Sequence, residues 1–132
     1  MSGNVNLIKF ILPWPPSVNK RLAHRRGQGR IYLSHYFKDY YKAAGAAIID
    51  QLRYKNKIIT EPVDQILTFH PPDNRRRDND NYTKAVNDAL KHAKIVEDDS
   101  LFRDCLTQWR APVENGCVKV TLGKIKFSVG EI

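Results

Sequence analysis

Two acidic residues separated by one position follow a run of three arginines, in the stretch RRRDNDNYTK. Asp78 and Asp80 flank Asn79, so both carboxylates can turn toward one point. At a separation of about 4 Å and an effective dielectric constant of about 20, two carboxylates repel by about 4 kcal/mol. A shared proton, an arginine or a divalent cation would offset this repulsion. Oxygen-only ligands suit Mg²⁺, which one or two carboxylates hold together with water and phosphate.

A third acidic group is available farther along the chain, in the stretch EDDS, where Glu97, Asp98 and Asp99 are candidates. A metal site would need one of these to return to the first pair. Each acidic group also has a plainer interpretation. Asp78 or Asp80 could cap the helix that follows it, and EDDS could be a solvated loop.

Lys84 lies four residues after Asp80, which places both on one face of a helix. It could stabilise charge beside the two acids, or it could form an exposed helix ion pair with Asp80. A calcium loop beginning at Asp78 is excluded, because its sixth residue must be Gly and its twelfth Glu. The chain has Thr83 and Ala89 at those positions.

The elements that would position these residues follow the order β-α-β-α-β-β. Hydrophobic alternation and helical spacing predict strands over 5–12, 63–70, 101–110 and 117–127, and helices over 34–54 and 80–93. Asn115-Gly116 is a hairpin signal between the last two strands. The pattern predicts one α+β domain over residues 1–132, a two-layer domain with a mixed four-stranded sheet and two helices packed on one face.

The charge balance favours a polyanionic partner, with nucleic acid ahead of a membrane surface. Lys and Arg together number 22 against 14 Asp and Glu, which gives a net charge of +8. Singly, each cation could be a solvated surface charge. As a group, the candidates for contacts with a phosphate backbone are Arg75, Arg76 and Arg77, with Lys20, Arg21, Arg25, Arg26 and Arg30 in the loop around Gly27 and Gly29.

The remaining composition indicates a cytoplasmic protein. The two cysteines, Cys105 and Cys117, lie beside apolar residues in strand-like segments, so we expect two buried thiols in a reducing compartment. The first residues form no signal-like apolar run behind a basic start, and no apolar stretch approaches the length of a membrane span. We expect no membrane partner.

Three stretches in order, LPWPPSVN, RRRDNDNYTKAVNDAL and EDDS, together resemble the RusA family of Holliday-junction-resolving endonucleases. The resemblance runs from about Leu12 to Phe127. It implies a homodimer that binds four-way DNA junctions and nicks two opposing strands symmetrically during DNA recombination and repair. It also implies Mg²⁺ or Mn²⁺ as the cofactor, without a small-molecule cofactor.

The family pattern assigns roles residue by residue. It implies that Asp78, Asp80 and Asp99 bind the metal and that Lys84 is catalytic, with Asp98 and Asn81 in support. Where many relatives have a glycine after the second helix, this chain has Lys94. A non-catalytic nucleic-acid-binding protein and a broader flap or single-strand nuclease are the alternatives.

Overall fold

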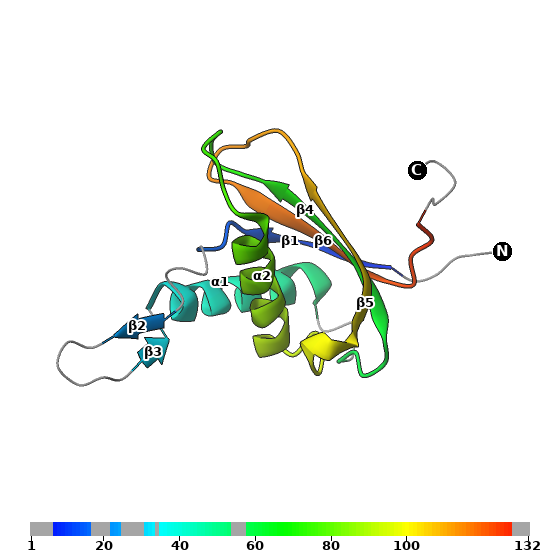
Figure 1. The fold of residues 1–132 in the computed structure, drawn as a ribbon. Coiled ribbons are helices and arrows are strands. Elements are labelled where there is room, and N and C mark those ends of the chain that lie inside the picture. Colours follow the sequence, from blue (N-terminus) through cyan, green and yellow to red (C-terminus); the bar gives the residue numbers. More distant parts are fainter. Residues whose placement is uncertain (1–6, 17–21, 25–30, 34, 54–57, 128–132) are drawn as a thin grey trace.

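The computed structural model describes residues 7–16, 22–24, 31–33, 35–53 and 58–127 of the 132-residue chain. Two helices, α1 (His35–Leu52) and α2 (Asn79–His92), and a short 3-10 turn, η2 (Asp99–Leu101), accompany the strands (Figure 1). The strands are β1 (Ile8–Pro13), β2 (Leu22–His24), β3 (Ile31–Leu33), β4 (Val63–His70), β5 (Phe102–Trp109) and β6 (Cys117–Gly123). The predicted order of the main elements is confirmed.

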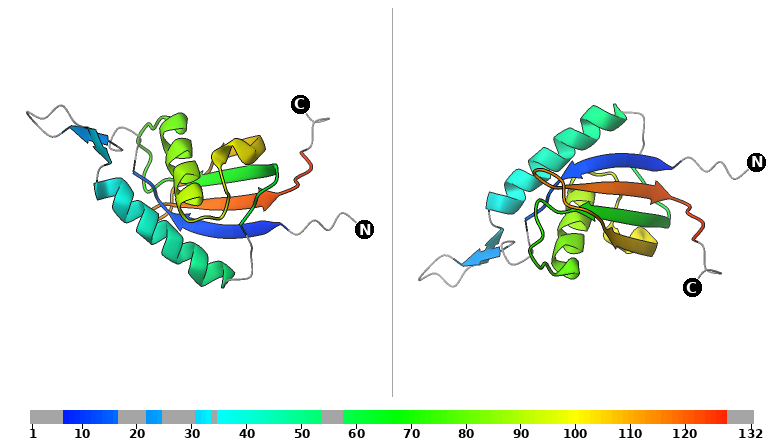
Figure 2. Two further views of the ribbon diagram at one scale, coloured as in Figure 1. Left: turned by 90° about the horizontal axis from the view of Figure 1, so that it is seen from below. Right: turned by 90° about the horizontal axis from the view of Figure 1, so that it is seen from above.

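The main sheet has four strands in the order β1-β6-β4-β5. β4 and β5 are parallel, and the other neighbours are antiparallel, so the sheet is mixed. The helices lie on one side of it. In Figure 2, α2 lies in front of the strands when seen from below and behind them when seen from above, with α1 along the β1 side. The predicted α+β fold class is confirmed.

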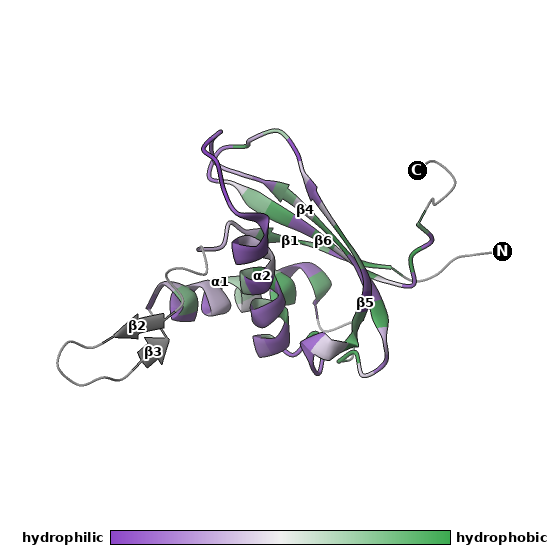
Figure 3. Cartoon of the chain, in the orientation of Figure 1, coloured by the Kyte–Doolittle hydropathy of each residue, from purple (hydrophilic) through white to green (hydrophobic). Residues whose placement is uncertain are grey.

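The core lies between this sheet and the helices. Four alternate residues along β4 are buried, namely Val63, Gln65, Leu67 and Phe69. Residues at helical spacing along α1 are also buried, at Phe37, Tyr40, Tyr41, Ala44 and Ile48. Gln65 is a polar residue in this core, and its Nε2 donates to Oδ1 of Asn87 on α2 at 2.7 Å. Figure 3 shows that most of the visible surface of α2 is hydrophilic.

The predicted hairpin between β5 and β6 is wrong. The chain passes across the end of β4, so that β6 pairs with β1 and β4 while β5 lies at the sheet edge. Burial agrees with the central place of β6, because Val118, Val120 and Leu122 are only 0–1% exposed. β5 is half-buried or exposed along its whole length.

Asn115 and Gly116 nevertheless form a turn between β5 and β6, as the sequence predicted. Asn115 and Gly116 both have positive φ angles, of 65° and 71°. A Cβ atom at Gly116 would lie 2.9 Å from Cδ of Pro72 and 3.0 Å from Cβ of Trp14. Two independent reasons therefore favour glycine at position 116. Its backbone has a positive φ angle, and a side chain there would collide with Pro72, in the segment that leads to α2.

One edge of the sheet is occupied by a side chain. The amide of Gln51, in the last turn of α1, accepts from the backbone N–H of Ile11 at 2.7 Å and donates to its carbonyl at 2.6 Å. These are the two bonds that a neighbouring strand residue would make. The primary amide thus substitutes for one residue of a further strand beside β1.

Two features differ from the sequence-based expectation. The segment before α1 contains a two-stranded antiparallel ribbon of β2 and β3, where only a flexible turn was expected. The expected burial of both cysteines is wrong, since Cys105 is exposed and Cys117 half-buried. Cys105 lies on the edge strand, where one side lacks a neighbour. No helix in the described part of the chain has both the length and the apolar character needed to cross a bilayer.

Lys94 ends α2 in a left-handed conformation, with φ 61°. The N–H of Ile95 donates to the carbonyl of Leu90 at 3.1 Å, and the N–H of Lys94 donates to that of Lys91 at 3.0 Å. This pair of bonds defines a Schellman motif, whose left-handed position favours glycine. Ile95 and Leu90 are both buried, which supplies the hydrophobic contact typical of the motif.

We expect Lys94→Gly to stabilise the fold by about 1 kcal/mol, because glycine removes the left-handed strain at only a partial entropic cost. The midpoint of urea unfolding should rise. Ala93→Gly is the matched control, since Ala93 has a helical φ of −78°. That substitution should destabilise by about 0.5–1 kcal/mol. If Lys94→Gly lowers the urea midpoint instead, the left-handed backbone of Lys94 does not destabilise the fold.

Candidate active site

The first acidic pair lies at the start of α2. Asp78 is the N-cap residue, and its Oδ1 accepts the backbone N–H of Asp80 at 3.0 Å. The capping interpretation is therefore confirmed for Asp78. Asp80 lies in the first turn of the helix, and both carboxylates are exposed. The positive end of the helix dipole stabilises both negative charges at this terminus.

An aromatic cluster holds this end of the helix. Trp14 follows β1, Phe69 and Trp109 lie near the ends of β4 and β5, and Tyr82 lies in the first turn of α2. Trp109 stacks on Phe69 with ring centroids 4.9 Å apart, and Trp14 contacts all three other rings at 5.1–5.8 Å. Trp109 Nε1 donates to Oδ1 of Asn79 at 2.7 Å. Four segments therefore meet at the acid-bearing terminus.

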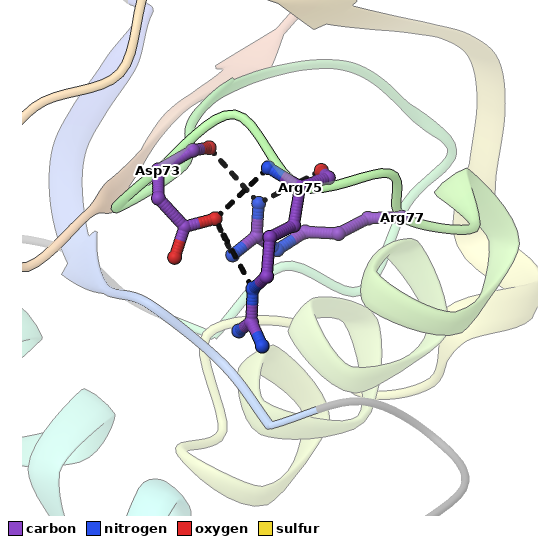
Figure 4. A network of polar contacts seen from close by, with 3 residues as sticks. All are labelled: Asp73, Arg75 and Arg77. Atoms are coloured by element: carbon purple, nitrogen blue, oxygen red, sulfur yellow. Dashed lines mark hydrogen bonds and ion pairs between the residues drawn. The ribbon is translucent and has the colours of Figure 1, made fainter.

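The three arginines before the acids differ in their environment. The Arg77 side chain is only 5% exposed, whereas that of Arg75 is 78% exposed. Arg76 is also exposed. Arg77 Nη2 pairs with Oδ1 of Asp73 at 2.7 Å, as Figure 4 illustrates for this network. Arg75 and Arg76 are thus presented to solvent as predicted, and Arg77 is not.

The other expected cationic residues are Lys20, Arg21, Arg25, Arg26 and Arg30. They lie outside the described residues.

The third acid lies after the end of α2. Asp99 is the first residue of η2, and it is exposed. Asp98 caps η2, where its Oδ2 accepts the N–H of Ser100 at 3.0 Å. Its Oδ1 pairs with Nζ of Lys91, in the last turn of α2, at 3.0 Å. Asp98 therefore fastens the acid-bearing turn to the end of the helix.

The structure does not bring the three acids together within one chain. The fourteen residues of α2 extend about 21 Å, with Asp78 and Asp80 at one end and Asp99 beyond the other. Figure 1 shows η2 at the opposite end of α2 from the β4 connection. Among the described residues, no group of three His, Cys, Asp or Glu side chains is placed to hold a metal. Carboxylate oxygens suit Mg²⁺ chemically, but the described part of one chain does not bring these three carboxylates to one point.

The outer surface of α2 connects the two ends. Lys84 is exposed one turn after Asp80, and Asn81 is half-buried between them. Neither Asp80 nor Lys84 takes part in an ion pair within the described part of the chain, so the helix-pair interpretation is not confirmed. The ammonium group of Lys84 is therefore available to a ligand that approaches the start of the helix.

Asp73, Asn79 and Trp109 are site residues that sequence reasoning did not identify. The signal for Asp73 was its position four residues before Arg77, inside the PPD turn. Trp109 gave no such signal, and only the pairing of β5 with β4, which puts Trp109 opposite the buried Phe69, places it at this site. Asn79 gave no signal beyond its place between two acids.

Comparison with known proteins identifies the family. The model of the endodeoxyribonuclease RusA family matches residues 13–122, which is most of the chain. This chain belongs to the RusA family.

Individual RusA relatives agree with this assignment. The crossover junction endodeoxyribonuclease RusA of Escherichia coli strain K12 is 32% identical over 134 residues, covering 97% of this chain and 98% of the relative. The protein of the same name from Shigella sonnei shows the same identity and coverage. The crossover junction endodeoxyribonuclease of Enterobacteria phage HK97 is 40% identical over 101 residues, covering 76% of this chain and 80% of its own.

Asp98 gives this RusA member a pH-dependent contact. The side chain and N–H of Ser100, with the Lys91 ammonium, hold the pKa of the Asp98 carboxyl well below its usual range. A carboxyl whose pKa is lower in the folded state stabilises the fold above its unfolded pKa of about 3.9. That stabilisation is lost as the pH falls further toward the folded-state pKa.

We expect Asp98→Asn to lower the urea midpoint at pH 7, and the difference from wild type to shrink as the pH falls below about 4. The measurement is a series of urea titrations from pH 7 to pH 2.5. Glu97→Gln is the control, because it removes the charge of an exposed neighbouring acid that forms no ion pair within the described residues. If the difference in urea midpoint between wild type and Asp98→Asn stays constant from pH 7 to pH 2.5, the ionised Asp98 carboxylate does not stabilise the fold as expected.

Proposed function

We propose that this protein is a metal-dependent endodeoxyribonuclease that resolves four-way DNA junctions by paired symmetric nicks, in DNA recombination and repair. The observation that carries the proposal is the RusA family match over residues 13–122, within which all the proposed acids and Lys84 lie. The relatives named as crossover junction endodeoxyribonucleases cover nearly the whole chain. With recombining DNA as its substrate, the protein acts in the cytoplasm.

Asp78, Asp80 and Asp99 are the proposed ligands of Mg²⁺, for which Mn²⁺ can substitute. Their carboxylate oxygens form the hard donor set that these cations prefer. A cation held by these residues would supply Lewis-acid chemistry, which would lower the pKa of a nucleophilic water and neutralise charge on the scissile phosphate. The helix dipole favours the acids in their ionised form, in which they can serve as ligands.

Lys84 is the proposed stabiliser of developing charge. Hydrolysis adds water to phosphorus and expels the 3′ oxygen, so negative charge increases on the phosphate oxygens in the transition state. An exposed ammonium one turn from Asp80 can bind that charge. Asn81 supports the same helix turn, and Asp98 supports η2, which carries Asp99.

A homodimer is the proposed active form. The acids at opposite ends of α2 support a site that a second chain completes. If two copies of α2 pack antiparallel about a two-fold axis, the start of one helix lies beside the end of the other. Each of the two sites would then take Asp78 and Asp80 from one chain and Asp99 from its partner. Two equivalent sites also match two symmetric nicks.

DNA contacts are proposed for Arg75, Arg76 and Arg77 before α2, and for Lys20, Arg21, Arg25, Arg26 and Arg30. Contacts of this kind bind phosphates without reading sequence, so affinity should fall steeply as salt rises.

The test of this function is cleavage of a synthetic four-way junction with Mg²⁺, beside linear duplex and flap controls. We expect paired symmetric nicks from the junction alone, abolished by Asp80→Asn while junction binding survives. Lys119→Ala, an exposed residue on the helix-free face of the sheet, should leave cleavage unchanged. Binding without cleavage would indicate a binding protein, and equal cutting of every DNA would indicate a broader nuclease.

Subunit mixing tests the shared site. Asp80→Asn and Asp99→Asn should each be inactive alone, but their heterodimer should contain one intact site and one doubly damaged site. We expect the mixture to recover single nicks, at about one quarter of wild-type total activity if half the dimers are mixed and each carries one of two sites. Cleavage products on a denaturing gel give the measurement. A mixture that stays inactive after confirmed exchange of subunits would show that each chain holds its own site.

A further inference from the structure

Gln65 of β4 is the polar side chain in the buried core of the described chain. It is 1% exposed, and its Nε2 donates to Oδ1 of Asn87 on α2 at 2.7 Å. The residues that α2 buries are apolar, namely Ala85, Val86, Ala89 and Leu90. Burial of apolar surface is not directional, whereas a hydrogen bond is. The Gln65–Asn87 bond therefore specifies a position of the helix that apolar packing alone leaves free.

A second bond of the same kind ties the start of α2 to the sheet. Trp109 Nε1, at the end of β5, donates to Oδ1 of Asn79 at 2.7 Å. Asn79 and Asn87 are about 12 Å apart along the helix axis. Gln65 lies about 13 Å along β4 from Phe69, the residue that pairs with Trp109. Because these two spacings are similar, one straight helix can make both bonds, and a shift of α2 along the sheet would misalign both.

We propose that Gln65 is a positioning residue, which acts through Asn87 to fix where α2 lies along the sheet. Asp80 and Lys84 lie on the helix between its two bonded asparagines, so both bonds restrain them. Asp99 follows the far end of the same helix. Because Gln65 is buried, it acts on these groups through the helix alone.

The inference rests on the proposed function, because the groups that α2 carries are the proposed metal ligands and the proposed stabiliser of charge. In the proposed dimer, a shift of α2 in each chain would change the distance between the acids that the two chains contribute. Displacement of a reacting group by about 1 Å can reduce a rate about 100-fold. Loss of the Gln65–Asn87 bond should therefore slow cleavage in the bound complex without weakening DNA binding.

The decisive variant is Gln65→Leu/Asn87→Leu, which replaces both partners of the bond with apolar side chains. Asn87→Leu alone leaves the buried Gln65 amide without its partner, so it should lower the urea midpoint. Replacing both partners can be nearly neutral for stability, so the double variant should recover most of that loss. The directional bond is absent from both variants, so stability and positioning are separated.

If the bond positions α2, we expect the double variant to keep a single-turnover cleavage rate about 10- to 100-fold below wild type, with junction affinity within about three-fold of wild type. Recovery of the rate together with the urea midpoint would overturn the proposal, because the bond would then contribute to stability alone.

Asn87→Asp is the conservative variant, because a carboxylate oxygen can still accept from Gln65 Nε2. We expect it to cleave close to the wild-type rate, whereas Asn87→Leu should be slow when both are measured in urea-free buffer. This pair also decides the question if the double leucine variant does not fold. Equal rates in Asn87→Asp and Asn87→Leu would overturn the proposal.

The matched control is a bond on the opposite face of the same sheet. Thr68 Oγ1 of β4 donates to Oε1 of Gln108 on β5 at 3.1 Å, and neither residue contributes to the proposed site. We expect Thr68→Val/Gln108→Leu to leave the cleavage rate unchanged. An equal loss of rate in this control would also overturn the proposal, since any polar contact of the sheet would then affect cleavage.

Failure of the proposed function can be separated from failure of the positioning role. If the wild-type protein cleaves no junction, the function fails, and the position of α2 is still measured by NMR without DNA. The chain has two tryptophans, so Trp109→Phe assigns their indole N–H signals. We expect Gln65→Leu/Asn87→Leu to move the Trp109 indole signal and the backbone N–H signal of Asp80, about two helical turns from position 87. If both signals stay unchanged, Gln65 does not position the start of α2.

Discussion

The length of α2 is the constraint on which the functional arrangement depends. Backbone hydrogen bonds fix the rise of a helix, so Asp80 and Asp99 cannot approach each other without unfolding it. Both ends are held, one by the aromatic cluster and the other by the Schellman motif and the Lys91–Asp98 ion pair. A single chain therefore folds without the mutual repulsion of three clustered carboxylates. In the proposed dimer, the acids would meet only where a second copy and a cation are present, so assembly and metal binding would be coupled.

The start of α2 is built almost entirely by residues distant in the chain. Trp14 comes from the end of β1, Phe69 from β4 and Trp109 from β5, and they meet Tyr82 at the first helical turn. The parallel pairing of β4 and β5 brings two of these strand ends to the same edge of the sheet. The turn at Gly116 packs against this assembly as well. The position of the acidic pair is thus a property of the whole sheet edge.

Periodicity predicted β4 and both main helices closely, because each of these elements buries one face and exposes the other. It could not predict the order of the strands, because the pattern within one strand does not state which strands pair; burial alternates along β6 but not along β5. The family motif predicted the identity of Asp78, Asp80 and Asp99, but a linear motif does not state that a rigid helix separates them. Arg77 resembled its two neighbours in charge, and only its burial distinguishes it.

The amide of Gln51 has a consequence for how copies of this chain can associate. By occupying the backbone groups of Ile11, it leaves β5 as the open edge of the described four-stranded sheet. A sheet with two open edges can add copies without limit, as fibrils do, whereas a sheet with one can pair only once. Strand addition would therefore stop at a closed pair joined through two β5 edges. The side chain of Gln51 thus blocks one position at which a second copy could add a strand beside β1.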